Sequence, residues 1–500
     1  MAKSDLFLAI DLGTSLVKVG AFDSEGRLVA SANARYETLC PRPGWVEQVP
    51  EAWWAACCQA IKDVASRINP TQLRGASVVG LGPTLVCVDE QGGVVCPASI
   101  WSDRRAVAEI AELAERLGHD TSFSLLPRFL WVKRHEPANY HRTRWVFQSF
   151  DYISFKLTGQ VGCIAPAGQL PPWSTRDIEK SGLDPEKFPC RVCNVGELFG
   201  SLASDVAAQV GLPSGLPVVA GTVDTFAAWI GTATTRKGVL CNTVGTSDGI
   251  GIVWDQPLSD PKGRVHPIPH LTGRDWILGG AMSSGGIILD WFVRRFYDGI
   301  PNPFELITKE VNSVPIGAEG LIALPYLVGE QSPIFDPHAR AVFFGITERH
   351  TRAHFARAVL ESVAFAVRDV CEVVREMGAE IEEVRLAGGA AHNRVWSQIK
   401  ADMLGRRVLI PEIADSGLLG TAIIAGCGVG CLGNLSEAAE KMVKFQAILE
   451  PNPDNHAMYT QLFEFYRSLY VHLKADFVRM VELNKMLQSH YQKTTERIAS

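Results

Sequence analysis

The first 36 residues contain short runs in which apolar positions either continue or alternate with polar ones. Residues 6–10 form an uninterrupted apolar run, which is typical of a buried strand, and Asp11 follows them. Residues 16–22 alternate with a period of two, and residues 28–36 form another strand-like run after a turn. The pattern predicts three strands, with Asp11 and the tripeptide Gly13-Thr14-Ser15 at the tip of the first hairpin.

This tip has the composition of an anion-binding turn. Glycine lets the backbone approach a ligand closely, and N–H groups exposed in such a turn can hold an anion. The carboxylate of Asp11 could hold the divalent cation that neutralises a polyphosphate. A strand followed by Gly-Thr-Ser is also common as a simple tight turn, so the tip alone leaves both interpretations open.

A second copy of the pattern strengthens the first interpretation. Residues 239–254 read VLCNTVGTSDGIGIVW, in which an apolar run leads to Gly245-Thr246-Ser247 and then to an alternating run. Residues 276–281 indicate one more strand after a loop. Two strand–Gly-Thr-Ser–strand units predict a duplicated fold in which a phosphate is held between two tips.

Length and composition limit the class of protein. A chain of 500 residues exceeds one ordinary core, so two domains are expected. The net charge of −6 gives no electrostatic reason to bind nucleic acid or an anionic membrane. The first apolar run is too short for a signal peptide, and the uncharged residues 416–436 are interrupted by glycines, which favours a buried helix over a membrane span. We expect a cytoplasmic protein.

Two further segments carry candidate functional residues. Asp224 lies where an apolar strand changes into a helix of small residues, and its carboxylate is either a helix N-cap or a catalytic group facing a cleft. We favour the catalytic interpretation because the second Gly-Thr-Ser follows soon after. Trp101 and Asp103, in the segment WSDRR, could line a pocket for a polar ligand, and Asp103 could equally be an N-cap.

The last third of the chain adds a glycine-rich turn and a long helix. Gly388-Gly389 follows a short strand and precedes a helix, a position that suits close approach of a nucleotide. Beyond Pro451 and Pro453 the apolar residues keep a helical period from Leu462 to Leu487. This helix is expected to pack across the domains or to form a dimer contact.

Taken together, the motifs resemble those of one known family. IDLGTSLVK, PGWVEQVPEAWW, WSDRR, GTVDTFAAWIG, TVGTSDG, YLVGEQSP, FFGIT, AGGAAHN and DSGLLGTAIIAG occur here in the order typical of FGGY carbohydrate kinases. GITERHTRAHFARAVLE also resembles the family's C-terminal motif. The resemblance extends from Leu6 to about Tyr470 and is greatest to the xylulose-kinase branch.

The resemblance implies an α/β fold of two actin/hexokinase-like (ribonuclease H-like) domains, each with a mixed five-stranded sheet. ATP and the sugar would bind in the cleft between them. The expected domains are residues 1–237, which would bind the sugar and carry the catalytic base, and residues 238–450, which would bind the nucleotide. Residues 451–500 would form the C-terminal helix.

Individual roles follow from the same resemblance. Asp224 would be the general base, and Asp11 would hold Mg²⁺. ATP would be contacted by Gly13, Thr14, Ser15, Lys18, Gly245, Thr246, Ser247, Gly388, Gly389 and Asn393. The sugar would be contacted by Trp101, Asp103, Asp224 and Thr225.

Three departures from the xylulose-kinase pattern concern the sugar. Residues 81–84 read Leu-Gly-Pro-Thr instead of Gln-Met-His-Gly, GCIAPAGQLPPW replaces a stretch rich in Asp and Ser, and Thr225 replaces Asn. Arg128 also stands where the family has lysine. The leading hypothesis is phosphorylation of D-xylulose to its 5-phosphate, with another ketopentose, a polyol or a sugar acid as alternatives. A catalytically inactive sugar-binding regulator is the alternative of another class, and the retention of Asp11, Asp224 and both tips argues against it.

Overall fold

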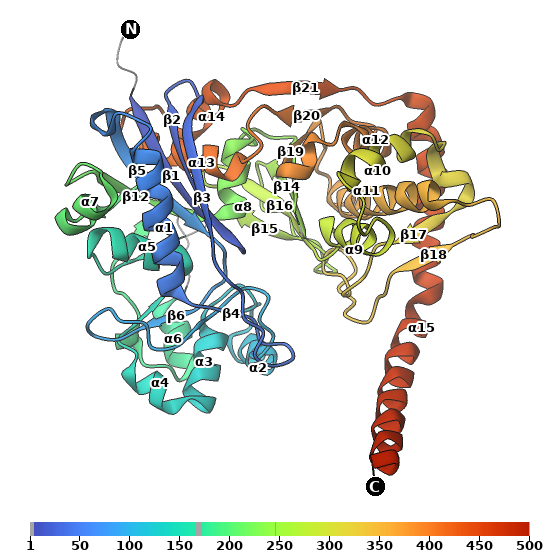
Figure 1. Cartoon of the computed structure of the whole chain (residues 1–500), viewed down its shortest axis with the longest axis horizontal. Helices are drawn as coiled ribbons and strands as arrows, with labels where there is room; N and C mark the ends of the chain where they lie inside the picture. Colours follow the sequence, from blue (N-terminus) through green and yellow to red (C-terminus); the bar gives the residue numbers. More distant parts are fainter. Residues whose placement is uncertain (1–4, 166–172, 246, 500) are drawn as a thin grey trace. The chain divides into compact units, whose positions relative to one another are not determined.

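The computed structural model describes residues 5–165, 173–245 and 247–499, which form two compact units. Unit 1 contains residues 1–235, 269–275 and 415–444, and unit 2 contains residues 236–268, 276–414 and 445–500 (Figure 1). The sequence predicted a domain boundary after residue 237, whereas in the structure the boundary between the two units lies between Thr235 and Arg236. Residues 415–444, expected with the second domain, belong to unit 1.

Unit 1 is organised around a six-stranded sheet whose central strands are parallel. The order is β11 (Leu198–Ser201), β12 (Pro217–Val223), β5 (Leu73–Gly80), β1 (Leu6–Leu12), β2 (Leu16–Asp23) and β3 (Leu28–Arg35). The three strands expected near the N-terminus are therefore present. Short two-stranded ladders lie beside this sheet: β4 (Glu47–Gln48) with β7 (Ala98–Ser99), β6 (Val86–Val88) with β8 (Trp145–Phe147), and β9 (Cys163–Ala165) with β10 (Val192–Asn194).

Helices cover both faces of this sheet. One face packs against α1 (Pro50–Ala65), α5 (Ser149–Thr158) and α7 (Ser204–Val210), and the other against α8 (Asp224–Gly231) and α13 (Ser416–Gly428). The remaining helices of the unit are α2 (Val107–Leu117), α3 (Leu126–His135), α4 (Pro137–Arg142), α6 (Thr175–Ser181) and α14 (Leu435–Met442), with 3₁₀ turns at Pro70–Gln72 and Pro185–Lys187.

The alternation of β1 decides which side chains meet which helices. Leu6, Leu8, Ile10 and Leu12 belong to the core under α1, α5 and α7. Phe7 points to the opposite face, because a Cβ placed on Gly426 of α13 would be 3.1 Å from its ring. Asp11 has the parity of Phe7, since successive strand residues face opposite sides of a sheet. The carboxylate of Asp11 is thereby directed to the side of α8 and α13.

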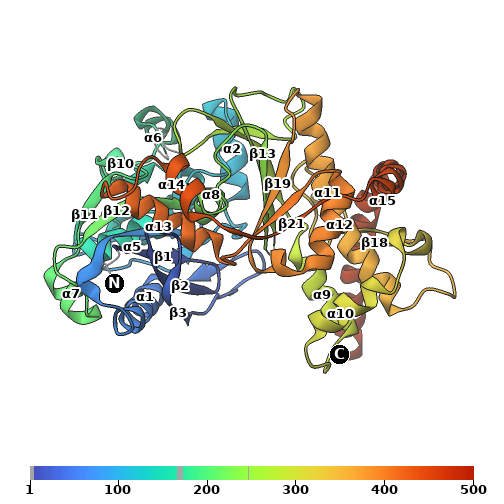
Figure 2. The same ribbon diagram turned by 90° about the horizontal axis from the view of Figure 1, so that it is seen from above.

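α8 and α13 pack against each other through glycines (Figure 2). A Cβ at Gly231 would lie 1.7 Å from the carbonyl oxygen of Ser416, and one at Gly420 would lie 1.8 Å from that of Ala227. Such distances exclude any side chain, so the two backbones are in direct contact. α13 is a buried helix, and the sequence prediction for residues 416–436 is confirmed in this respect. In the described parts of the chain, no helix has the length and apolar character needed to cross a bilayer.

Unit 2 repeats the topology of unit 1 in a seven-stranded sheet. Its order is β15 (His266–Pro269), β16 (Trp276–Met282), β14 (Asp248–Trp254), β13 (Val239–Val244), β19 (Glu383–Ala387), β20 (Val408–Pro411) and β21 (Phe445–Leu449). From β16 to β21 the pairings are antiparallel, antiparallel, parallel, parallel and antiparallel, the same series as from β3 to β11. The predicted duplication is confirmed. The sheets exceed the expected five strands because edge strands are added: β11 in unit 1, and β15 and β21 in unit 2.

Helices of unit 2 enclose a core around α11. The helices are α9 (Gly286–Phe296), α10 (Pro303–Asn312), α11 (Arg352–Glu376), α12 (Arg394–Leu404) and α15 (Pro453–Ala499), with 3₁₀ turns at Ile316–Gly320 and Gly389–His392 and a ladder of β17 (Ile322–Leu324) with β18 (Val342–Phe344). The first half of α15 belongs to this core, because Tyr459 and Tyr466 are fully buried. Its second half exposes Met480 and Leu487. The predicted dimer contact through this helix stays a prediction.

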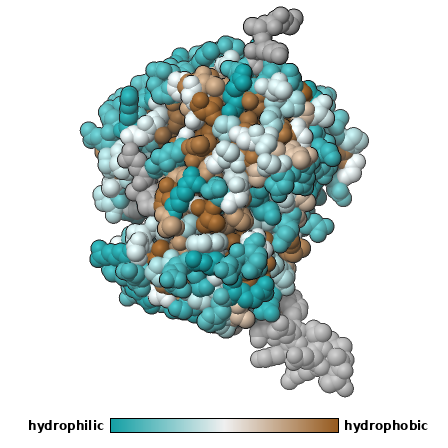
Figure 3. Space-filling model, turned by 90° about the vertical axis from the view of Figure 1, so that its left-hand side faces the viewer, coloured by the Kyte–Doolittle hydropathy of each residue, from teal (hydrophilic) through white to brown (hydrophobic). Residues whose placement is uncertain are grey.

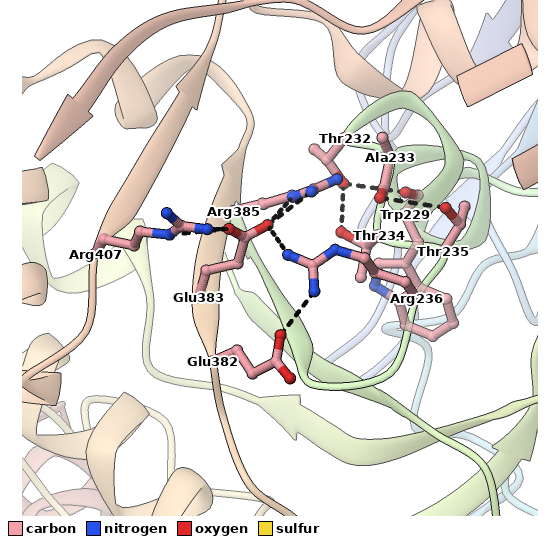
Figure 4. Close-up of polar contacts among 10 residues, drawn as sticks. All are labelled: Trp229, Thr232, Ala233, Thr234, Thr235, Arg236, Glu382, Glu383, Arg385 and Arg407. Atoms are coloured by element: carbon pink, nitrogen blue, oxygen red, sulfur yellow. Dashed lines mark hydrogen bonds and ion pairs between the residues drawn. The ribbon is translucent and has the colours of Figure 1, made fainter. Parts of the chain in front are cut away.

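A buried carboxylate with three arginine partners stabilises the start of unit 2 (Figure 4). Glu383 is 1% exposed. It accepts hydrogen bonds from Arg385 and Arg407 at 2.7 and 2.6 Å, and Arg236 forms an ion pair with it at 3.0 Å. Although burial raises the pKa of Glu383, these guanidinium groups hold it below its ordinary value. The carboxylate is therefore ionised, and it ties the first residue of unit 2 to β19.

The surface carries some apolar side chains. On the face drawn in Figure 3, brown residues gather in an irregular band between hydrophilic margins. Exposed apolar residues of unit 1 include Leu28, Val29, Val192 and Leu198. A folded protein has too little polar surface to cover itself completely, so some exposed apolar residues are normal.

The glycine contact between α8 and α13 generates a stability prediction. Gly231→Ala should lower the free energy of unfolding by about 1–3 kcal/mol, because the new methyl group overlaps the carbonyl of Ser416. Gly389→Ala is the control, since a Cβ there would meet nothing within 4 Å. Urea unfolding followed by circular dichroism measures both variants. Equal stabilities would contradict the contact.

Candidate active site

The first tip connects β1 to β2 and carries a cross-strand charge pair. Asp11 lies within β1, one residue before its end, and is the direct antiparallel partner of Lys18 in β2. Direct partners point to the same face of a sheet. Gly13 closes the turn by donating its N–H to the carbonyl of Leu16 at 3.1 Å, and Thr14 and Ser15 are exposed. The structure thus brings together four of the predicted ATP contacts and the predicted metal ligand.

The carboxyl group of Asp11 is almost completely buried. Its side chain is 8% exposed, and its Oδ1 has no hydrogen-bond partner in the described parts of the chain. Burial raises its pKa to about 7, and the neighbouring carboxylates of Asp224 and Asp415 add to the increase, whereas Lys18 opposes it. An unpaired buried carboxylate oxygen is costly unless a proton or a cation occupies it. This oxygen therefore fits a cation ligand.

Asp224 is the first residue of α8, directly after β12. Its Oδ1 accepts hydrogen bonds from the N–H of Thr225 at 2.6 Å and from the Thr225 hydroxyl at 3.2 Å. The N-cap position belongs to Val223, so the N-cap alternative for Asp224 is wrong. Burial raises the pKa of Asp224, while the hydrogen bonds from Thr225 limit the increase. Thr225 thus contacts one of the two carboxylate oxygens, Oδ1.

Sequence reasoning missed Asp415, which precedes α13 and forms an ion pair with Lys18. Burial would lower the pKa of Lys18, but the contacts with Asp415 and Asp11 raise it above its ordinary value. The ammonium group is thus charged and faces three carboxylates. The pair spans 397 residues of sequence, so no local pattern could have revealed it. The only sequence signal for Asp415 was its place at the start of the motif DSGLLGTAIIAG.

Gly417 keeps the space beside these carboxylates open. A Cβ at this position would lie 3.6 Å from Oδ2 of Asp11 and 3.6 Å from the carbonyl oxygen of Asp224. Gly417 therefore lies against both residues. The close packing of α13 on α8 puts all three residues on one side of the sheet of unit 1.

Trp101 and Asp103 have different surroundings. The indole N–H of Trp101 donates to the hydroxyl of Thr14 at 3.4 Å, which connects Trp101 to the first tip. Asp103 is 6% exposed, and its oxygens accept hydrogen bonds from the N–H of Val46 and from Arg105. It is not an N-cap, because α2 begins after Ala106. Its oxygens are hydrogen-bonded within the protein, and its contact with the sugar stays a prediction.

The second tip is braced from two sides. Gly245 is exposed, and its carbonyl accepts the N–H of Gly286 at 2.7 Å. Ser247 is half-buried, and Thr246 lies outside the described residues. Glu330, from the YLVGEQSP segment, accepts the N–H groups of Ser283 and Ser284 at 2.5 and 3.2 Å. Burial raises the pKa of Glu330 to about 7.

A buried polar group supports the strands of this tip. Lys400 donates to Oδ1 of Asn242 at 2.5 Å and lies 3.5 Å from Oδ2 of Asp248. Asn242 also donates to Asp248 at 3.0 Å. Burial lowers the pKa of Lys400 and raises that of Asp248, and each opposes the shift of the other. These side chains hold β13 and β14 in register just below the tip.

The glycine-rich turn lies beside the second tip. Gly388 has φ +91°, and a Cβ on it would be 2.4 Å from the carbonyl oxygen of Val244, the last residue of β13. Only glycine fits there, because both the dihedral angle and the space exclude a side chain. Gly389 is exposed with open space around it. Asn393 caps α12 by accepting the N–H of Trp396 at 3.1 Å, which gives it a structural role.

A metal ion here would need ligands from outside the protein. Among the described residues, no group of three or more His, Cys, Asp or Glu side chains could hold a metal. Magnesium usually binds through one or two carboxylates together with water and substrate phosphates. Asp11, with its unpaired Oδ1, fits that pattern as a single carboxylate ligand.

The raised pKa of Asp11 predicts a pH-dependent stability. Between pH 3.8, the ordinary pKa of an aspartate, and about pH 7, the folded state binds more protons at this carboxyl than the unfolded state, so stability is lost as the pH rises through that range. Asp11→Asn should remove this loss. The free energy of unfolding of the variant, measured relative to that of wild type, should therefore rise by up to about 4 kcal/mol between pH 4 and pH 8. Urea unfolding at both values measures it, with the exposed Asp63→Asn as control. A pH-independent difference would refute the assignment.

Comparison with known proteins shows which family the chain is similar to. Residues 6–231 match the N-terminal domain, and residues 240–429 the C-terminal domain, of the FGGY family of carbohydrate kinases. A xylulose kinase of Bacillus subtilis (strain 168) is 32% identical over 502 residues, which cover 96% of this chain and 98% of that protein. A gluconokinase of the same organism is 26% identical over a match that covers 97% of this chain and 99% of that protein. The crystal structure of a xylulose kinase from Rhodospirillum rubrum superimposes with a TM-score of 0.82 at 26% identity, covering 94% of this chain and 99% of the other. The actin/hexokinase-like fold is thus established, and the chain belongs to the FGGY family of carbohydrate kinases.

Proposed function

We propose that this protein transfers the γ-phosphoryl group of ATP to the terminal hydroxyl of D-xylulose, giving D-xylulose 5-phosphate. The observation that carries the proposal is the position of the buried Asp11 and the half-buried Asp224, whose carboxylates lie with Lys18 on one face of the unit 1 sheet. Phosphoryl transfer depends on an aligned nucleophile and on neutralised charge more than on covalent catalysis. The resemblance to named xylulose kinases supports the choice of sugar.

Asp224 is proposed as the general base. A sugar hydroxyl barely ionises at neutral pH, so a carboxylate within hydrogen-bond reach assists by accepting its proton. Burial raises the pKa of Asp224, which makes it a stronger base than an exposed aspartate. Thr225 orients the carboxylate by bonding Oδ1, and we infer that Oδ2 accepts the proton.

The tips and Lys18 are proposed to hold the phosphates of ATP. In unit 1 these are Gly13, Thr14, Ser15 and Lys18; in unit 2 they are Gly245, Thr246 and Ser247. Lys18 would neutralise phosphate charge, because its ammonium group is held protonated by its neighbours. Asp11 would hold Mg²⁺, which neutralises further negative charge on ATP when bound. The adenosine would lie against Gly388, Gly389 and the cap residue Asn393.

Two residues besides Asp224 are proposed for the sugar site. Trp101 is connected to the first tip through Thr14, and Thr225 borders the base. A sugar acid is the second candidate substrate, favoured by the likeness to a gluconokinase of Bacillus subtilis. Cytoplasmic location and a homodimer stay predictions of the sequence.

A substrate panel tests this function. D-xylulose, D-ribulose, gluconate and glycerol are supplied with Mg-ATP, and ADP release is measured with a coupled assay. We expect kcat/KM for D-xylulose to exceed the others by about tenfold or more, which corresponds to about 1.4 kcal/mol of transition-state binding. If gluconate or ribulose is turned over faster than D-xylulose, that compound replaces D-xylulose as the proposed substrate. Absence of ADP release with every compound would favour the inactive regulator.

The role of Asp224 has its own test. Asp224→Asn should lower kcat by about 10²–10⁴-fold, because the amide cannot accept the hydroxyl proton. ATP affinity, measured by isothermal titration calorimetry, should stay within about twofold of wild type. Asp205→Asn is the control, since Asp205 is exposed on α7. A kcat of Asp224→Asn equal to that of the control would remove Asp224 from the mechanism.

A further inference from the structure

The carbonyl groups of the first tip are held from beneath by side chains of another segment. The hydroxyl of Tyr36 donates to the carbonyl oxygen of Gly13. The amide Nε2 of Gln48 donates to the carbonyl oxygen of Thr14 at 2.6 Å and to the hydroxyl of Thr38 at 2.7 Å. Thr38 also reaches the Thr14 carbonyl at 3.5 Å. Two consecutive carbonyls of the tip thereby point toward Tyr36, Thr38 and Gln48. We call these three side chains the Gln48 layer.

Trp53 decides which end of the Gln48 amide faces the tip. Its indole N–H donates to Oε1 of Gln48 at 2.9 Å, and both side chains are 0% exposed. An indole can donate but not accept, so the oxygen of the amide must face Trp53. The NH₂ group is then left to donate to Thr14 and Thr38. The backbone of Gln48 is fixed as well, because it pairs with Ala98 in the β4–β7 ladder.

The direction of these two carbonyls also fixes the direction of the N–H groups on the opposite side of the tip. In a planar trans peptide the C=O and the following N–H point in opposite directions. Holding the carbonyls of Gly13 and Thr14 inward therefore turns the N–H groups of Thr14 and Ser15 away from the Gln48 layer. In the part of the chain that the structure describes, neither N–H has an acceptor. Consecutive free N–H groups form a concavity that binds anions.

We propose that Gln48, oriented by Trp53, and Tyr36 are positioning residues that keep the Thr14 and Ser15 N–H groups directed at the phosphates of ATP. The inference rests on the proposed function, and it assigns a purpose to the segment PGWVEQVPEAWW that a buried core alone does not require. Donors that are already oriented need no reorganisation when the ligand arrives, which is the source of their effect on binding and rate. Tyr36 and Gln48 contact the backbone of the tip and Trp53 contacts Gln48, so they act through the tip as positioning residues.

Three substitutions remove single hydrogen bonds while conserving shape. Gln48→Met removes the donor to Thr14, Trp53→Phe removes the group that orients the amide, and Tyr36→Phe removes the donor to Gly13. We expect Gln48→Met to weaken ATP binding about tenfold, as the loss of one to two hydrogen bonds would. Adenosine, which lacks phosphates, should bind each variant as it binds wild type. Isothermal titration calorimetry with ATP and with adenosine measures both.

Two controls separate positioning from general loss of structure. Gln398→Met removes a glutamine whose Nε2 likewise donates twice, at 2.8 and 2.9 Å, in unit 2. Tyr140→Phe removes a buried hydroxyl of unit 1 that accepts the N–H of Asp184. Both should bind ATP as wild type does. If ATP and adenosine weaken together in Gln48→Met, or if its ATP affinity is unchanged, the proposal is overturned.

Gln48→Glu supplies a readout that a purely structural role would not move. An ionised carboxylate cannot donate to the Thr14 carbonyl, whereas a protonated one can. The ATP affinity of this variant relative to wild type should therefore recover at least threefold as the pH is lowered from 8 to 6. A constant ratio contradicts the proposal. These binding experiments need no sugar, so they remain decisive even if the substrate panel shows no turnover.

Discussion

The direct contact of α8 with α13 is the constraint on which the candidate site depends. Gly231 and Gly420 have no room for a Cβ, so the two helix backbones lie against each other in unit 1. α8 begins with Asp224, and Asp415 directly precedes α13. The close packing of the helices therefore brings two acidic residues, separated by almost 200 positions in the sequence, to the face of the sheet where Asp11 lies. A bulkier interface would separate the carboxylates and their common partner Lys18.

Electrostatics follows from this packing. Burial of Asp11 and Asp224 favours their protonated forms, and mutual repulsion adds to the effect for Asp11. Lys18 opposes it, because its charge is stabilised by Asp415 and by Asp11. The group holds one cation among three carboxylates, which leaves an excess of negative charge and an unpaired oxygen on Asp11. A site of this kind is stabilised by an added cation, and a base with a raised pKa suits removal of a proton from a hydroxyl.

The two tips show how one strand pattern is braced in different ways. Both lie between paired antiparallel strands at the same place in a repeated sheet. The first tip is supported by Gln48 and Tyr36, which bind its carbonyls. The second is supported by Gly286 through the backbone and, one layer below, by Lys400 with Asp248. The duplication conserves the backbone topology, whereas the supporting side chains come from unrelated segments. Two tips with the same Gly-Thr-Ser sequence therefore need not bind a ligand with the same affinity.

The sequence by itself determined the strands around both tips, the duplication and the family, and it predicted Asp11, Asp224 and Lys18 as site residues. These features are local, because alternation of apolar residues and glycine-containing turns reflect the geometry of a few neighbouring residues. Tertiary structure alone decided the membership of residues 415–444 in unit 1, the ion pair of Lys18 with Asp415, the structural use of Asp103 and the orientation of Gln48 by Trp53. Edge strands β11, β15 and β21 were also undetected, since short edge strands carry little periodicity. Each of these depends on contacts between segments far apart in the chain, which side-chain packing selects and no local pattern encodes.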